Sequence, residues 1–240
     1  MKVSALCLTY GRNELLAEAV ESFLRQDFVD SELLIFNTLT SQKLWMDHPR
    51  VRVINHPFRP STLGETRNLA IKECRGDFIL TWDDDDIYLP HYISWLVNHV
   101  GDGDWVRQAA RFDLTRWSIS KISYQACNQL MFRKTAWERL GGYPALDSGE
   151  DRVFVGKLQA SCPGRHLELP KEQIGFMYGW DNGVFHISGC GENQPDKATA
   201  LERARRHVQS SSYRRGKVQI VPRWVKDYSA MVRDFLSSNP

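Results

Sequence analysis

The chain reads Phe78-Ile79-Leu80-Thr81-Trp82-Asp83-Asp84-Asp85-Asp86 at the stretch that decides its fold, a largely apolar strand followed by four aspartates. Adjacent carboxylates raise one another's pKa unless a cation or solvent relieves them. Carboxylate oxygens suit Mg²⁺ and Mn²⁺, and open α/β sheets bind ligands at the carboxyl ends of their strands. The stretch therefore predicts a metal-assisted site for a phosphorylated ligand. The alternative is a solvated acidic loop or an acid-rich helix start.

Strand and helix patterns alternate over the first hundred residues. Short apolar runs predict strands at residues 3–8, 32–36, 51–55 and 77–82, and apolar residues at helical spacing predict helices at 14–26, 63–74 and 90–100. This alternation predicts an α/β fold, a mixed but mostly parallel sheet flanked by helices.

The second half of the chain is less regular. Strands are expected at residues 105–111, 118–123 and 128–132, and helices at 133–140, 198–208 and 225–236. Residues 201–240 carry nine Lys or Arg against three Asp or Glu. This basic tail is either a solvated helix face or a surface for an anionic partner.

Composition excludes several classes of protein. The net charge is only +2, so the whole molecule is not a polycation built for nucleic acid. The five cysteines form no CxxC pair, which argues against a zinc site and favours a reducing compartment. The amino-terminal apolar run is too short for a signal-peptide core, and no run approaches the ~20 apolar residues of a membrane span. A cytoplasmic location is expected.

Further motifs stand in order around the aspartates. They are Val3-Ser4-Ala5-Leu6-Cys7-Leu8-Thr9-Tyr10-Gly11-Arg12, Ala19-Val20-Glu21-Ser22-Phe23-Leu24-Arg25-Gln26, Gly64-Glu65-Thr66-Arg67-Asn68-Leu69-Ala70, Asp83 to Pro90, Phe132-Arg133-Lys134 with Leu140-Gly141-Gly142-Tyr143, and Gly149-Glu150-Asp151. This ordered set, over roughly residues 3–190, resembles the inverting family 2 nucleotide-sugar glycosyltransferases. The resemblance implies the Rossmann-like GT-A fold, with a catalytic domain at 1–195 and a basic helical extension at 196–240.

The resemblance assigns different roles to the four aspartates. Asp83 and Asp85 match the acids of the DxD motif, with Asp85 as the direct metal ligand and Asp83 facing the ribose or the water shell of the metal. Asp84 is the variable middle position, grouped with the donor-binding residues, and Asp86 has a supporting role. The implied metal is Mn²⁺ or Mg²⁺, which would neutralise the charge that builds on the leaving diphosphate.

The resemblance also implies a general base. Asp151 matches the aspartate of the family's ED motif, and Glu150 would position donor or acceptor. The alternative is that this acid pair caps the following helix. His186 is the candidate third metal ligand, because a neutral imidazole suits Mn²⁺. Its alternative is an ordinary core or surface histidine.

The nucleotide pocket would be lined by Thr9, Tyr10 and Arg12, with Arg67 near the ribose or diphosphate. Tyr10 could equally be a packing residue and Arg67 an exposed helix residue. Asn37 stands where the family usually has an aspartate, which leaves the base open: UDP is the first expectation, with GDP or dTDP as alternatives.

Two other functions compete with this one. A sugar-1-phosphate nucleotidyltransferase would need a glycine-rich phosphate loop, and the loop at residues 9–13 has one glycine. A nucleotide-sugar or glycan-binding module with a degenerate site is the non-enzymatic alternative. The acceptor is open among glycan, lipid and nucleic acid, and the basic tail suggests an anionic one. The stretch Gln219-Ile220-Val221-Pro222-Arg223-Trp224 has one residue too many for the Q-x-x-R-W motif of processive synthases, so transfer of a single sugar is expected.

Overall fold

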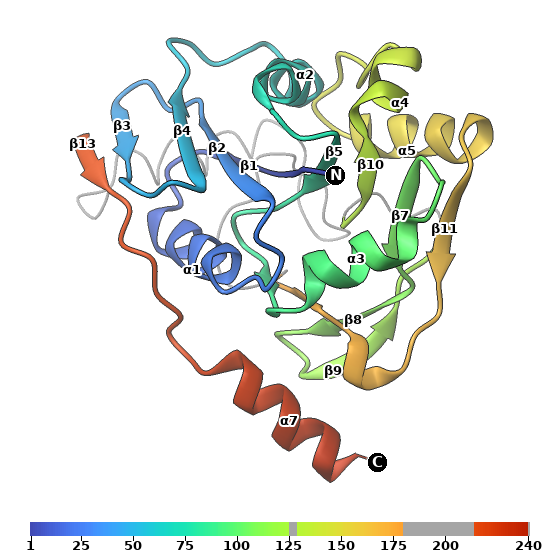
Figure 1. The fold of residues 1–240 in the computed structure, drawn as a ribbon. Helices are drawn as coiled ribbons and strands as arrows, with labels where there is room; N and C mark the ends of the chain where they lie inside the picture. Colours follow the sequence, from blue (N-terminus) through green and yellow to red (C-terminus); the bar gives the residue numbers. More distant parts are fainter. Residues whose placement is uncertain (125–128, 180–213, 240) are drawn as a thin grey trace.

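The computed structural model describes residues 1–124, 129–179 and 214–239, and its centre is a seven-stranded sheet (Figure 1). Its strands lie in the order β11 (Gly164–Leu167), β7 (Trp105–Gln108), β10 (Met131–Arg133), β5 (Phe78–Thr81), β1 (Val3–Thr9), β2 (Ser31–Asn37) and β4 (Val51–Asn55). The strands β5, β1, β2 and β4 are parallel, whereas β10 runs antiparallel to both of its neighbours. The predicted α/β fold with a mostly parallel sheet is confirmed.

Helices cover both faces of this sheet (Figure 1). One face packs against α1 (Asn13–Leu24) and α3 (Tyr92–Val100), and the other against α2 (Leu63–Glu73), α4 (Lys134–Arg139) and α5 (Glu150–Ser161). Strand β1 shows why: Ala5 lies in the core with Phe23 of α1, and Leu6 lies in the opposite core with Ile71 of α2. A strand buried on both faces reads as a continuous apolar run, which is the pattern that predicted it.

Two small sheets were not predicted. One joins β6 (Ile87–Tyr88), β12 (Phe176–Tyr178), β8 (Ala110–Asp113) and β9 (Ser118–Lys121), and the other pairs β3 (Gln42–Trp45) with β13 (Gly216–Gln219). The strand expected at 105–111 was wrong in its extent, because the chain leaves the large sheet after β7 and enters the small one as β8. A short 3-10 helix, η1 (Lys171–Gln173), precedes β12. Within the described ranges, no helix combines the length and apolarity that crossing a bilayer requires.

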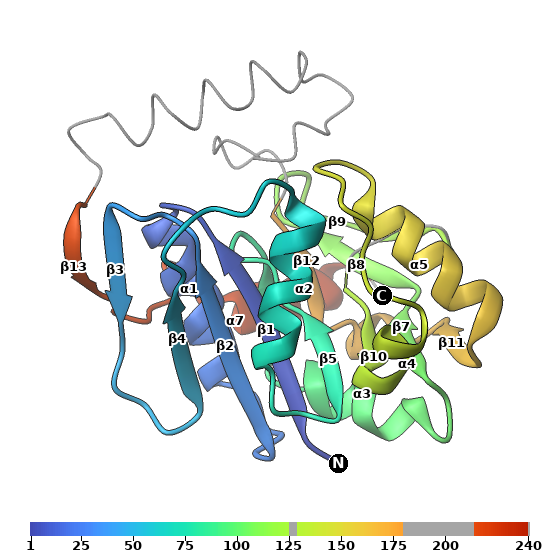
Figure 2. The same ribbon diagram turned by 90° about the horizontal axis from the view of Figure 1, so that it is seen from above.

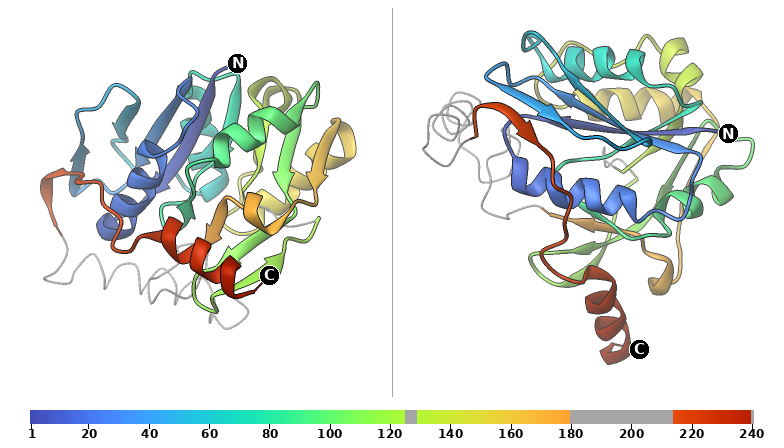
Figure 3. Two further views of the ribbon diagram at one scale, coloured as in Figure 1. Left: turned by 60° about the horizontal axis from the view of Figure 1, so that its bottom comes forward. Right: turned by 60° about the vertical axis from the view of Figure 1, so that its left-hand side comes forward.

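The carboxyl-terminal segment, residues 214–239, runs along α1 and ends in α7 (Tyr228–Ser238) (Figures 2 and 3). The helix expected at 225–236 is thus present with shifted ends, and the one expected at 198–208 lies outside the described residues. The described part of the expected helical extension begins instead with a strand, β13. Trp224 Nε1 donates to Ser22 Oγ at 3.0 Å, and the Tyr228 hydroxyl donates to Glu18 Oε2 at 2.6 Å. These contacts attach the segment to α1.

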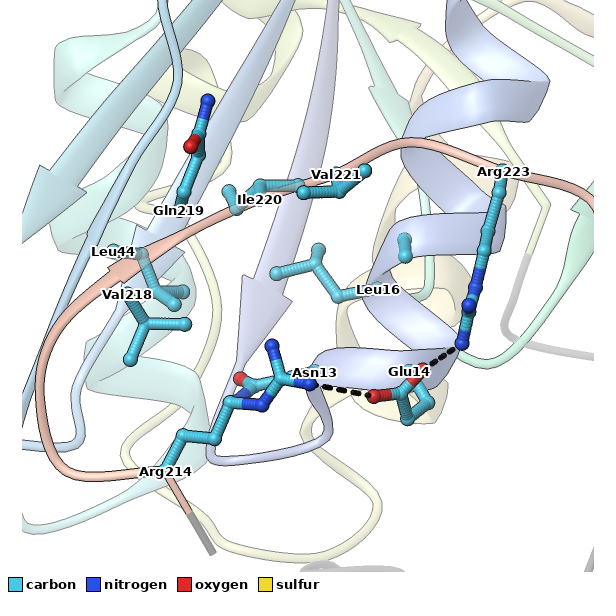
Figure 4. A pocket seen from close by; sticks show the side chains of 11 residues that line it. Asn13, Glu14, Leu16, Leu44, Arg214, Val218, Gln219, Ile220, Val221 and Arg223 are labelled. Atoms are coloured by element: carbon cyan, nitrogen blue, oxygen red, sulfur yellow. Dashed lines mark hydrogen bonds and ion pairs between the residues drawn. The ribbon is translucent and has the colours of Figure 1, made fainter.

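Two arginines of the same segment meet one carboxylate of α1. Figure 4 shows Arg214 and Arg223 reaching Glu14 from two sides, beside a pocket of about 230 Å³. The Arg214–Glu14 pair measures 3.8 Å, and Arg223 forms a second pair with the same carboxylate. Arg223 and Trp224, which stand in the imperfect Q-x-x-R-W stretch, are therefore both engaged on α1.

A buried carboxylate fixes the start of the parallel sheet. Glu32 of β2 is 4% exposed and accepts hydrogen bonds from Ser4 Oγ at 2.7 Å, from the Arg75 backbone N–H at 2.6 Å and from Arg52 Nη1 at 3.2 Å. Burial alone would raise the pKa of Glu32, but these hydrogen bonds outweigh it and leave the pKa below its usual value. The charged form of Glu32 therefore stabilises the fold.

We expect Glu32→Gln to lower the free energy of unfolding at pH 7 by about 1–3 kcal/mol, because hydrogen bonds to a charged group are lost. The stabilisation is fully present above the ordinary glutamate pKa of about 4.3 and is lost as the pH falls through the lower folded pKa. Urea denaturation at pH 7 and at pH 4 measures both effects. The exposed Glu73→Gln is the control, and equal stabilities of wild type and Glu32→Gln at pH 7 contradict the prediction.

Candidate active site

The aspartate run is held in place by the tryptophan that precedes it. Trp82 is fully buried, and its Nε1 donates to the Ala19 carbonyl of α1 at 3.0 Å. Its ring stacks on Tyr88 with centroids 3.7 Å apart, and the Tyr88 hydroxyl accepts the Asp83 N–H at 2.8 Å. The first aspartate is thereby set at the end of β5 without a contact to its carboxylate.

The second aspartate joins the run to the loop that follows β1. Asp84 is fully buried, accepts the Thr9 hydroxyl at 2.7 Å and forms an ion pair with Arg12. Arg12 Nη1 also lies 2.7 Å from Asp85 Oδ2. Burial alone would lower the pKa of Arg12, but Asp84 and Asp85 raise it. The residue treated as a variable middle position is thus the most deeply bound carboxylate of the run.

The first and last aspartates lie in a poorly solvated setting. Burial raises the pKa of Asp83 to about 6, with Asp85 adding to the rise and Arg67 opposing it. Burial, and then Asp85, raise the pKa of Asp86 well above its usual value, although Asp86 Oδ1 accepts the Gly179 N–H at 2.7 Å. In the part of the chain that the structure describes, the Asp83 carboxylate accepts no hydrogen bond and forms no ion pair. A carboxylate in this setting favours a cation.

A second acid pair begins α5. Glu150 is 2% exposed, and its Oε1 lies 3.0 Å from Arg67 Nε of α2. Burial raises the pKa of Glu150, and Asp151 adds to the rise. Asp151 Oδ1 accepts the Arg152 N–H at 2.7 Å. The N-cap position is Gly149, which has no side chain to cap the helix, but both acids accept hydrogen bonds from backbone N–H groups of the first turn. A role at the start of the helix and a role in catalysis are therefore compatible.

A close backbone approach brings this acid pair to α2. A Cβ atom on Gly64 would lie 1.8 Å from the Pro144 carbonyl oxygen, and the Gly64 N–H donates to Leu146 at 3.0 Å. Gly149, just before the acids, has a φ of 75°, in the left-handed region that favours glycine. Both glycines belong to the sequence motifs, but a single sequence does not reveal the close approach at Gly64 or the left-handed conformation at Gly149.

Arg67 connects the two acid clusters. It pairs with Glu150, lies 5.5 Å from the Tyr143 ring centroid, and interacts electrostatically with Asp83 and Asp151. Burial alone would lower the pKa of Arg67, and the neighbouring acids and Tyr143 raise it instead. The Arg67 guanidinium therefore interacts with Asp83 and also with the pair Glu150 and Asp151. More than sixty positions of sequence separate these two groups of acids. The alternative of an exposed helix arginine is wrong, since the side chain is 13% exposed.

The remaining candidates for binding the nucleotide sugar, Tyr10 and Asn37, have different surroundings. The Tyr10 ring lies 4.6 Å from the guanidinium of Arg59, a residue that the sequence did not single out. Asn37 is 1% exposed, and its Nδ2 donates to Gln42 at 2.9 Å and to Asn55 at 3.0 Å. Its Oδ1 accepts the Leu39 N–H at 3.0 Å, so the amide of Asn37 is satisfied inside the chain.

Among the described residues, the side chains of this site that could ligate a metal are few, and they are carboxylates. Among the residues the structure describes, no group of three or more His, Cys, Asp or Glu side chains is gathered as a metal site. His186, the predicted third ligand, lies outside the described residues. Asp83 and Asp85 fit a hard cation that keeps several waters and takes its other ligands from substrate phosphates, as Mg²⁺ commonly does.

The overall architecture matches solved glycosyltransferases. The S. aureus TarS fragment 1–349 in complex with UDP-GlcNAc superposes with a TM-score of 0.64 at 16% identity, over 89% of this chain and 68% of that one. The mannosyltransferase PcManGT from Pyrobaculum calidifontis, in complex with GDP-Man and Mn²⁺, gives 0.60 at 15% identity, over 87% and 74%. The predicted GT-A fold is confirmed.

The sequence match is narrower and identifies the family. The family model described as Glycosyl transferase family 2 matches residues 4–135, and the chain belongs to that family. An uncharacterized glycosyltransferase of Bacillus subtilis, YwdF, is 31% identical over 50% of this chain and 48% of its own length. A Campylobacter jejuni GalNAc(5)-diNAcBac-PP-undecaprenol β-1,3-glucosyltransferase is 28% identical over 42% and 35%. The chain thus matches about half or less of the length of these relatives.

We expect Asp84→Asn to lower the free energy of unfolding by about 1–3 kcal/mol, because Arg12 loses its charged hydrogen bonds to the buried Asp84 but keeps its pair with Asp85. Chemical denaturation measures this loss. Asp102→Asn, on an exposed position, is the control and should stay within about 0.5 kcal/mol of wild type. A stability of Asp84→Asn equal to that of the control would show that the pair is not a structural anchor.

Proposed function

We propose that this chain is a metal-dependent inverting glycosyltransferase that moves one sugar from a nucleotide diphosphate sugar to an acceptor hydroxyl. The observation that carries the proposal is the position of Arg67, which pairs with Glu150 and acts electrostatically on Asp83 and Asp151. The Arg67 guanidinium lies between the two groups of acids. This arrangement fits a site that must hold a diphosphate at one end and a proton acceptor at the other. Family membership and the fold of the neighbours support the same class.

The donor would bind over the aspartate run. In this proposal Asp85 and Asp83 hold Mn²⁺ or Mg²⁺, with His186 as the third ligand and Asp86 in support. When bound, the divalent cation would neutralise charge on the leaving diphosphate and orient the donor. Asp83 supports this role because it is half-buried and its carboxylate has no hydrogen bond in the described ranges.

The nucleotide would lie against the loop after β1. Asp84 holds Thr9 at the end of β1 and Arg12 in the loop. We therefore assign those three residues to shaping the diphosphate site and Tyr10 to packing near the base. Arg59, stacked on Tyr10, joins this group, whereas Asn37 supports the fold rather than the base. UDP is the first expectation, supported by the UDP-GlcNAc complex of TarS, and GDP is the alternative suggested by the GDP-Man complex of PcManGT.

The reaction is a direct displacement at the anomeric carbon. The acceptor oxygen forms the new bond to that carbon as the bond to the diphosphate oxygen breaks, which inverts the configuration. Asp151 takes the hydroxyl proton, and the electron pair of the broken bond stays on the nucleotide diphosphate. Glu150 holds Arg67 at 3.0 Å, where its positive charge faces the developing negative charge.

The proposal also covers the domain boundaries and the acceptor. We assign the catalytic domain to residues 1–195 and a basic extension to residues 196–240. One relative is named as a glucosyltransferase acting on a GalNAc(5)-diNAcBac-PP-undecaprenol, which supports a glycan as the acceptor over a nucleic acid.

We expect Asp151→Asn to bind the donor as wild type does but to lose transfer by about 10²–10⁴-fold, because the general base is removed. Release of nucleotide diphosphate from a panel of UDP-, GDP- and dTDP-sugars, together with donor binding by calorimetry, measures both quantities. Asp234→Asn, exposed on α7, is the control. Transfer by Asp151→Asn at the wild-type rate would exclude Asp151 as the base. A wild type that binds donors but never releases nucleotide diphosphate would favour the binding module.

We expect EDTA to abolish turnover of the donor and Mn²⁺ or Mg²⁺ to restore it. Asp83→Asn should weaken metal-dependent donor binding by about tenfold or more, by analogy with the loss of a metal-orienting group. Titration of the nucleotide with and without metal measures this effect, and Asp102→Asn again serves as the control. Donor binding and turnover that persist in metal-free buffer would contradict metal dependence.

A further inference from the structure

A cavity of about 320 Å³ opens beside the aspartate run. Asp85 and Asp86 contribute to its wall, together with Glu18 of α1, Trp117 of the turn between β8 and β9, and Tyr228 of α7. Five separate parts of the chain, including Gly179 after β12, therefore line this cavity at the end of the candidate active site. The residues assigned above to the donor and to the general base leave this space without a role, apart from the aspartates themselves.

We propose that this cavity binds one sugar ring of a glycan acceptor. The inference rests on the proposed glycosyl transfer and adds the place where the acceptor binds and the side chains that contact it. It also gives a function to the carboxyl-terminal helix α7, whose Tyr228 and Met231 line the cavity.

The first argument is the conformation of Trp117. Its φ is 49°, which is uncommon for a residue with a bulky side chain and carries a cost in free energy. The indole packs edge-on against Phe235 of α7, with ring centroids 6.2 Å apart. A strained backbone thus presents a large flat ring to the cavity. Flat aromatic faces pack against the apolar C–H faces of sugar rings, whose hydroxyls then point outward to polar groups.

The second argument is the supply of such polar groups. Glu18 Oε2 already accepts the Tyr228 hydroxyl at 2.6 Å and the Val225 N–H at 3.2 Å. Glu18 Oε1 has no hydrogen bond among the residues the structure describes, and Lys226 Nζ has no ion pair among them. One fixed carboxylate oxygen and one ammonium group beside an aromatic ring match a ligand that carries several hydroxyls.

The third argument is size. Small-molecule pockets span about 300–1,000 Å³, so this cavity of about 320 Å³ lies at the small end of the range. It can hold a single ring and cannot enclose an oligosaccharide or a nucleotide. The acceptor chain would therefore place one ring here and extend out of the cavity.

The test uses methyl glycosides of glucose, galactose and N-acetylglucosamine as probes on the full chain. With ¹⁵N-labelled tryptophan, we expect each bound probe to shift the Trp117 indole signal, which Trp117→Phe identifies among the eight tryptophans. Thr115→Phe should fill the cavity and weaken probe binding by at least about tenfold. Arg116→Phe, the adjacent exposed position that does not line the cavity, should bind probes as wild type does.

Nucleotide titration of the same samples separates the two proposals. We expect wild type, Thr115→Phe and Arg116→Phe to bind the donor nucleotide equally. If the nucleotide binds but no probe shifts the Trp117 signal, or Thr115→Phe binds probes normally, the cavity proposal is overturned and the proposed function stands. If probes bind at Trp117 and no nucleotide binds, the cavity is a glycan site and the glycosyltransferase proposal fails. If neither ligand binds, both are overturned.

Discussion

A buried ion pair between Asp84 and Arg12 is the interaction on which the rest of the site depends. Four adjacent carboxylates at one strand end repel one another, and desolvation makes each more costly to keep charged. Arg12 offsets this by lying against two of them, and Thr9 donates a hydroxyl to the deeper one. The same contacts tie the loop after β1 to the end of β5. Strands β1 and β5 are thus joined by side-chain contacts at their carboxyl ends, the edge of the sheet where ligands of α/β proteins bind.

A second arginine, Arg67, pairs with an acid in the other half of the site. Arg67 comes from α2 and Glu150 from α5, so their pair crosses between two helices on the same face of the sheet. Near this pair, the backbone at Gly64 approaches Pro144 too closely for any side chain, which lets α2 and the chain before α5 lie side by side. Each of the two arginines therefore satisfies acids that would otherwise be costly to bury. Among the residues the structure describes, Asp83, Asp86 and Asp151 are the acids of the site that no arginine side chain pairs with directly. We assign metal contact to Asp83, together with the arginine-paired Asp85, and proton transfer to Asp151.

The sequence predicted the long, two-face-buried strands and the amphipathic helices because their periodicity is local and strong. It predicted β4 with both ends correct and β1 to within one residue. It missed β3, β6, β11, β12 and β13, because strands of two to four residues are defined by a distant partner and not by their own pattern. The motif order located the acids of the site but could not show the direction of each side chain. Asp84 points inward to Arg12. The Asn37 amide forms its hydrogen bonds with Gln42, Asn55 and Leu39. Only the packed structure can show either arrangement.

The pairing of β13 with β3 has a consequence for how the protein folds. Gln42 Nε2 hydrogen-bonds the Arg214 carbonyl across 172 positions of sequence, so this contact can close only after a very long loop has been ordered. Closing a loop carries an entropy cost that must be met before the contact stabilises the chain, and contacts between residues far apart in sequence form slowly. Until β13 arrives, β3 presents an open strand edge, which is a template for pairing with another chain. The late step of folding is therefore also the step at which self-association competes with the native structure.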